Sequence, residues 1–199
     1  MIEYLRGRLT HKQPTHLVLD VGGVGYGVDV TLRAAEAAGV VGETLQIPTW
    51  LHVKEELQEL YGFADELEKQ VFLKLISVSG IGPRMGLRML SSATPKHLAD
   101  LILSGDVRGL SGIKGIGKKT AEVLIATLRN SMAKMDFSAH GAGMTPSTQE
   151  NGLLRDAIQA LITLGVRDQA AQAAVQQAAA KLGAETQLSA LIAQALQEV

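Results

Sequence analysis

The sequence contains no cysteine and few aromatic residues, and these shortages exclude several kinds of site. Among its 199 residues there is no Cys, so disulfide bonds, zinc–thiolate sites and iron–sulfur clusters are excluded. Aromatic residues make up 4% of the chain, which disfavours the stacking surfaces that bind single-stranded nucleic acid. No apolar run is long enough to span a bilayer, and the charged N-terminus lacks the pattern of a signal peptide. We therefore expect a cytoplasmic protein without a membrane segment.

The net charge of −1 hides a strong segregation of charge along the chain. Residues 71–135 hold 10 Lys and Arg against 3 Asp and Glu, which gives a net charge of +7. Residues 1–70 carry −5 and residues 136–199 carry −3. A basic central segment is typical of a protein that binds the phosphate backbone of a nucleic acid, although helices that happen to be basic give the same count.

Within the basic segment, one motif occurs twice, 35 positions apart. The two copies are Ser79-Gly80-Ile81-Gly82-Pro83-Arg84 and Lys114-Gly115-Ile116-Gly117-Lys118-Lys119. Each Gly-Ile-Gly lies between two segments with helical periodicity. The flanking apolar residues also match in register: Leu75 with Leu110, Val78 with Ile113, and Leu90 with Ile125. A repeat of this kind predicts a tandem helix-hairpin-helix domain.

The composition of this motif suits the binding of phosphate. Its paired glycines permit a tight turn with positive φ and leave the backbone bare for a large ligand. The helix that follows offers unpaired N–H groups and a partial positive charge, yet cations occupy its first turn, where the helix dipole disfavours them unless an anion binds. We expect both hairpins to hold DNA phosphates without reading bases. The candidate DNA-binding residues are Ser79, Gly80, Gly82, Arg84, Lys114, Gly115, Gly117, Lys118 and Lys119.

The other patterns predict an α+β multidomain protein. Residues 1–63 suit a five-stranded OB-type β-barrel with one short helix over residues 32–38. Residues 64–134 form the helix-hairpin-helix domain, residues 135–150 have the composition of a flexible linker, and residues 151–199 predict a three-helix domain divided by Gly165 and Gly183. The expected strands are Ile2–Thr10, His16–Val21, Tyr26–Thr31, Thr44–Val53 and Leu57–Phe63.

A three-helix unit that follows a linker is typical of a docking module. Leu164 and Val166, beside the Gly165 turn, either complete the core of this unit or supply apolar surface for a partner, and periodicity alone does not decide between the two. The expected core residues are Leu154, Ile158, Leu161, Val175, Leu188, Leu191 and Ile192.

Several patterns resemble catalytic motifs but fail in detail. Residues 112–119 nearly match a phosphate-binding loop, but Lys119 replaces the hydroxyl residue that holds Mg²⁺. The five histidines have no metal-ligand spacing, so we expect no metal, cofactor or catalytic residue. The second hairpin also resembles that of base-excision glycosylase/lyases, with Lys119 and Asp136 as the reactive pair, but the chain lacks a second helical lobe to enclose a flipped base.

Taken in order along the whole chain, these features resemble the RuvA family of bacterial Holliday-junction-binding subunits. Besides both hairpins, the resemblance rests on Val21-Gly22-Gly23-Val24-Gly25-Tyr26, Lys54-Glu55-Glu56 and Leu60-Tyr61-Gly62-Phe63. It implies a UBA-like third domain and a non-catalytic homotetramer, sometimes doubled to an octamer, that binds an open four-way junction. It also implies two partners, the hexameric motor ATPase RuvB and, in a larger complex, the RuvC resolvase.

The resemblance assigns two further sets of residues. Glu55 and Glu56 correspond to an acidic pin at the junction centre, although two glutamates at a hairpin tip are most often a solvated turn. Leu161, Leu164 and Val166 correspond to the surface that contacts the motor. Two other functions remain open: a DNA repair lyase or nuclease that uses the same hairpins, and an architectural protein that binds duplex DNA of any shape. Junction preference and strand cleavage separate these alternatives.

Overall fold

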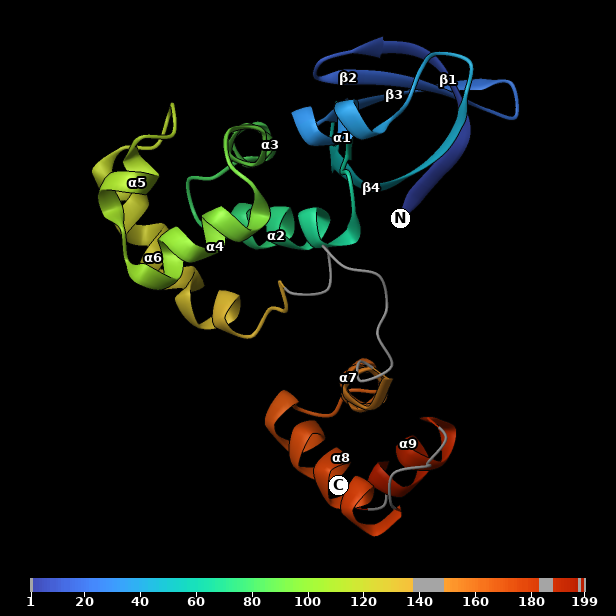
Figure 1. Cartoon of the computed structure of the whole chain (residues 1–199), viewed down its shortest axis with the longest axis vertical. Coiled ribbons are helices and arrows are strands. Elements are labelled where there is room, and N and C mark those ends of the chain that lie inside the picture. The colour runs from blue at the N-terminus through green and yellow to red at the C-terminus, as the bar shows by residue number, and fades with distance from the viewer. Residues whose placement is uncertain (1, 138–148, 183–187, 197, 199) are drawn as a thin grey trace. The chain divides into compact units, whose positions relative to one another are not determined.

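The computed structural model describes residues 2–137, 149–182, 188–196 and 198. The chain divides into two compact units, Met1–His140 and Gly141–Val199 (Figure 1). Most of the segment expected to be a linker, residues 135–150, lies outside the described residues.

The first part of the first unit is a closed five-stranded barrel with the strand order β1-β2-β3-β5-β4. Only β3 and β5 pair in parallel, and the antiparallel pairing of β1 with β4 closes the barrel. Alternate apolar residues such as Leu17 and Leu19 of β2 point into its core and are fully buried. The OB-type barrel expected from the sequence is confirmed. Its elements are β1 (Tyr4–Gln13), β2 (His16–Val21), β3 (Val24–Val30), α1 (Leu32–Ala37), β4 (Thr44–Lys54) and β5 (Leu57–Gly62).

Five helices follow the barrel and form the tandem helix-hairpin-helix part of the same unit (Figure 1). They are α2 (Glu66–Ile76), α3 (Pro83–Ser92), α4 (Pro95–Ser104), α5 (Val107–Ser111) and α6 (Lys118–Ala133). The apolar positions that match between the two repeats share one core: Leu75 and Leu110 are fully buried, and Ile125 packs against the same cluster. The repeat read from the sequence is therefore a structural repeat.

The barrel and the helices share this core. Tyr61 of β5 and Phe63, just after it, pack against Phe72 of α2, with ring centroids 5.7 and 4.8 Å apart. The boundary expected between residues 63 and 64 therefore falls inside continuous packing. Because close-packed cores deform little, the barrel and the hairpins are held in a fixed relation within this unit.

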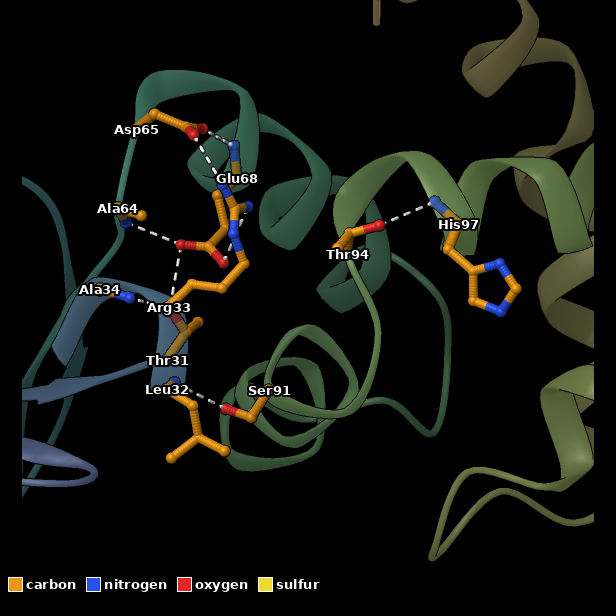
Figure 2. A network of polar contacts seen from close by, with 10 residues as sticks. All are labelled: Thr31, Leu32, Arg33, Ala34, Ala64, Asp65, Glu68, Ser91, Thr94 and His97. Atoms are coloured by element: carbon orange, nitrogen blue, oxygen red, sulfur yellow. Dashed lines mark hydrogen bonds and ion pairs between the residues drawn. The ribbon is translucent and has the colours of Figure 1, made fainter. Parts of the chain in front are cut away.

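A buried polar network reinforces the same junction between barrel and helices (Figure 2). The carboxylate of Glu68, which is fully buried, accepts hydrogen bonds from Thr31 Oγ1 at 2.9 Å and from the backbone N–H of Ala64 at 2.7 Å. Arg33 of α1 lies 3.5 Å from the other Glu68 oxygen and 3.2 Å from Asp65, the N-cap of α2. The network thus ties α1 of the barrel to the start of α2.

Two more polar contacts join the barrel to the helices. Ser91 of α3 accepts a hydrogen bond from the backbone N–H of Leu32, at 3.3 Å (Figure 2). Lys69 of α2, whose side chain is 6% exposed, forms an ion pair with Glu3. Together with the network around Glu68, these contacts hold the barrel to α2 and α3.

Glu68 is expected to make stability depend on pH. Burial raises the pKa of its carboxyl group, against the hydrogen bonds from Ala64 and Thr31. A raised folded-state pKa stabilises the fold fully below the unfolded pKa of about 4.3, and this stabilisation is lost as the pH rises through the higher folded value. Glu68→Gln keeps the shape of the side chain and does not titrate. Its Tm relative to wild type should therefore rise between pH 4.5 and 7.5, and a constant difference in Tm would contradict this assignment.

The second unit consists, in its described residues, of α7 (Gln149–Thr163), α8 (Asp168–Leu182) and α9 (Leu188–Leu196). Gly165 adopts a φ of 95° in the turn after α7, as expected, whereas Gly183 lies outside the described residues. None of the helices in the described part of the chain is long and apolar enough to cross a membrane. All seven expected core residues lie in or against one cluster, which confirms that prediction: Leu154, Ile158, Leu161, Val175, Leu188, Leu191 and Ile192.

Candidate nucleic-acid interface

The two Gly-Ile-Gly turns have the same backbone geometry. Gly80 and Gly115 adopt φ values of 89° and 98°, which only glycine reaches without strain. In both turns the isoleucine N–H donates to a carbonyl three residues earlier, Ile81 to Val78 and Ile116 to Ile113, each at 3.0 Å. These isoleucines are buried beneath the turns, whereas the glycines of both turns are exposed.

The second glycine of each turn differs from the expectation of positive φ. Gly82 and Gly117 adopt φ values of −86° and −85°, in extended backbone that any residue can adopt. A Cβ at either position would meet no atom within 4 Å. Neither strain nor packing within the chain therefore requires glycine there. A bare backbone at these positions instead permits close approach by a ligand.

The same two glycines leave the helices that follow them uncapped. In α1, α2, α4 and α5 a side-chain oxygen of the N-cap residue accepts the N–H three residues later, as Thr94 does from His97 in Figure 2. At α3 and α6 the N-caps are Gly82 and Gly117, and no side chain satisfies the first N–H groups. Compared with glycine at the N-cap, a side-chain cap stabilises a helix by only about a few tenths of a kcal/mol. Without such a cap, α6 keeps the N–H groups of its first turn open to an anion. In α3 the Arg84 N–H stays open, whereas Pro83 has no N–H and the Met85 N–H donates to the Gly82 carbonyl at 3.0 Å.

The lysines of the second hairpin are unpaired within the described residues. Lys114, Lys118 and Lys119 are exposed, and none of their ammonium groups forms a hydrogen bond or ion pair with another described residue. Lys118 and Lys119 occupy the first turn of α6, beside its open N–H groups. Three cations and a helix N-terminus therefore face solvent together at one turn.

The first hairpin is built differently, because Arg84 is tied to the barrel. Its guanidinium lies 2.9 Å from Glu59 of β5, which also accepts a hydrogen bond from the Tyr61 hydroxyl at 2.8 Å. The hydrogen bonds from Tyr61 and Arg84 lower the pKa of Glu59, whereas burial and the adjacent Glu59 raise the pKa of Tyr61 to about 12. Glu59 therefore stays ionised and orients Arg84. The corresponding residue of the second hairpin, Lys119, has no such partner among the described residues.

One cation near both hairpins was absent from the sequence prediction. Arg88 lies one turn after Arg84 on α3, yet its guanidinium sits at the second hairpin: a Cβ on Gly115 would lie 3.3 Å from an Arg88 nitrogen and 2.7 Å from the Met85 methyl. The repeat does not point to Arg88, because its counterpart in the second copy is Val123. Only its spacing of four from Arg84, on the same helix face, could have indicated it.

Glu55 and Glu56 form the two-residue turn between β4 and β5, where the sequence placed them. Lys54 and Leu57 are the last paired residues on either side. Both glutamates are exposed. The strand that follows this turn, β5, also carries Glu59, which forms the ion pair with Arg84.

The three residues assigned to motor contact lie in the second unit and differ in exposure. Leu161 is fully buried in the core, Val166 packs against it, and Leu164 is 64% exposed. Of these three, Leu164 alone offers a large apolar surface to a partner. Among the described residues, no group of three or more acidic or His side chains is arranged to hold a metal ion.

The basic repeat contains two helices that begin after a glycine and lack a side-chain cap, and it is joined to an OB-type barrel. These features define a tandem helix-hairpin-helix protein. A family model described as a SAM-like helix-hairpin-helix tandem matches residues 72–130, and one described as the RuvA N-terminal domain matches residues 1–62.

Curated relatives cover the chain. A Holliday junction branch migration complex subunit RuvA from Geotalea daltonii is 37% identical over 199 residues, which is 100% of this chain and 99% of the relative. Proteins of the same name from Geobacter metallireducens (98% of each chain) and Cytophaga hutchinsonii (83% of each) are 39% and 42% identical. The chain belongs to the RuvA family.

Proposed function

We propose that this chain is a non-catalytic subunit that binds four-way DNA junctions during branch migration, in recombination and DNA repair. The observation that carries the proposal is the pair of helix N-termini, at Gly82 and Gly117, that lack side-chain caps in a domain whose basic residues greatly outnumber its acidic ones. Backbone N–H groups and ammonium groups bind phosphate whatever the base sequence, which is what a moving junction requires.

Within this proposal, all nine candidate residues belong to the DNA-binding surface. The glycine turns present N–H groups, while Ser79 and Lys114 lead into the turns and Lys118 and Lys119 supply unpaired charge. Arg84 contributes charge from a position fixed by Glu59. The two hairpins therefore differ in their cations: Arg84 of the first is paired with the barrel, whereas the lysines of the second are unpaired among the described residues.

We further propose that the chain assembles as a homotetramer, or as an octamer on DNA, in the cytoplasm. Its partners are the motor ATPase RuvB, which supplies the ATP hydrolysis, and the RuvC resolvase. Each copy adds Glu55 and Glu56, so a fourfold assembly places eight carboxylates around the junction centre. Carboxylates near converging phosphates disfavour closed duplex and favour separated strands, so specificity arises from what is repelled.

The decisive experiment compares a four-way junction with linear duplex of equal length and sequence, with native mass measurement of the complexes. We expect a strong preference for the junction and four or eight copies of the chain on it. Equal binding of both DNAs would indicate an architectural duplex-binding protein. Strand cleavage, or an adduct trapped by borohydride, would indicate a repair enzyme.

The acidic turn is tested with Glu55→Gln and Glu56→Gln together. Because amides keep the shape of the turn and lose its charge, we expect the double variant to bind duplex several-fold more tightly and to show a smaller ratio of junction to duplex affinity. The effect should fade with salt, since the Debye length falls from about 10 Å at 0.1 M to about 3 Å at 1 M. If duplex affinity and junction preference are both unchanged, these glutamates form only a solvated turn.

The second unit is proposed to bind the motor. Leu164 would provide the contact, and Leu161 would support it from the core beneath, with Val166 at the edge. An exposed leucine beside a glycine turn is a small apolar site of the kind that a partner buries.

A further inference from the structure

Arg88 lies on the helix that follows the first hairpin, but its side chain reaches the turn of the second. One guanidinium nitrogen lies 3.3 Å from the position that a Cβ on Gly115 would occupy. Gly115 and Gly117 are two residues apart, so at most ~7 Å of backbone separates Gly115 from the uncapped N-terminus of α6. Arg88 therefore stands at the second hairpin's candidate phosphate site.

The charge of Arg88 is not neutralised within the described residues. Its side chain is exposed and forms no ion pair or hydrogen bond with another described residue. Arg84, one turn earlier, is by contrast held by Glu59 at 2.9 Å. Lys114, beside Gly115, adds like charge to the same turn. Repulsion among such cations is relieved when an anion binds between them.

We propose that Arg88 is a phosphate ligand that links the two hairpins: it extends from α3 of the first repeat and binds a phosphate at the second hairpin. The proposal rests on the phosphate-binding function given above. The guanidinium offers a planar fork of N–H donors, which pairs with two phosphate oxygens at once, whereas an ammonium group binds as a point charge. The second hairpin then holds phosphate through three kinds of group: backbone N–H, lysine and arginine.

The test is the salt dependence of binding of the full chain to a fluorescent four-way junction. Each phosphate contact contributes about 0.9 to the slope of log Kobs against log salt. For Arg88→Ala we expect this slope to shrink by about 0.9 for each engaged copy, so the loss of affinity between 50 and 200 mM salt becomes about 3.5-fold smaller per contact. Arg88→Lys should restore the slope with weaker affinity, since it keeps the charge without the fork.

Two matched variants separate a phosphate ligand from a structural role. Met85→Ala removes the other side chain that packs on Gly115, so it should weaken binding without changing the slope. Arg129→Ala removes an exposed arginine about 17 Å along α6 from Lys118, and should change the slope much less than Arg88→Ala does. An Arg88→Ala slope equal to wild type, or a loss equal to that of Arg129→Ala, would overturn the proposal.

The same salt-dependence measurement on the double variant Lys118→Ala with Lys119→Ala separates the role of Arg88 from the proposed binding of DNA phosphates by the hairpins. If the lysine variant loses slope and Arg88→Ala does not, only the role of Arg88 fails. If neither variant loses slope, the proposed phosphate grip fails as a whole.

Discussion

A chain truncated near Ser147 is expected to bind junction DNA with the affinity of the full chain and to lose all stimulation of branch migration by the motor. Both hairpins and the acidic turn lie within the unit Met1–His140, which has its own cores. The second unit builds a separate core from α7, α8 and α9. Removing it should therefore take away the proposed motor contact and leave the DNA-binding surface folded.

The measurement pairs junction binding with migration of a junction by the motor in the presence of ATP. Leu164→Ser should reproduce part of the migration defect in the full chain, because it removes the exposed leucine at the proposed contact. Leu196→Ser is the matched control, since Leu196 is a leucine of the same unit that is 45% exposed. Undiminished migration with the truncated chain would show that the motor binds elsewhere.

The elements of the fold were accessible to sequence reasoning because each leaves a local signal. Alternating apolar residues locate the strands, and the matched glycines and leucines locate the hairpins. Strand ends are less exact: β1 extends to Gln13, beyond the expected Thr10, because pairing with β2 continues to His16. Periodicity reports which residues are apolar but not how far pairing extends.

The contacts that make the two hairpins unequal leave no local signal. Glu59 and Arg84 are 25 residues apart, and their ion pair exists only because β5 packs against the helices through Tyr61 and Phe63. Arg88 reaches Gly115 through the packing of one repeat against the other. Such pairings depend on tertiary geometry, so the sequence indicated Arg84 but neither its ion-pair partner nor the role of Arg88.

The burial of each side chain likewise distinguishes core residues from surface residues that helical periodicity places on the same face. Leu161 was expected both in the core of the three-helix unit and at the motor contact, and the structure places it fully inside the core. Leu164, three positions later, is the exposed member of the set. A helical pattern gives a face, whereas the depth of each residue on that face depends on the neighbouring helices.

Replacing Lys118 and Lys119 together by Ala is expected to weaken junction and duplex binding about equally, and independently of base sequence. We assume that each lysine makes one phosphate contact, which contributes about 0.9 to the salt slope. Relative to wild type, the double variant should then lose about 60-fold more affinity at 0.1 M salt than at 1 M salt, for each engaged copy. Binding should be reduced rather than abolished, because the Arg84 N–H behind Gly82 and the N–H groups behind Gly117 remain open.

The matched control removes two exposed cations of the same domain that lie outside the hairpins, Lys96 and Arg129. It makes the same change in net charge, so it measures the general electrostatic contribution. We expect the salt slope to shrink by nearly two per engaged copy for the hairpin pair and to change much less for the control. Equal slopes in the two double variants would mean that DNA responds to the overall charge of the domain. A changed base preference with an unchanged slope would mean that the lysines contact bases, and in either case the hairpins would not be the phosphate grip proposed here.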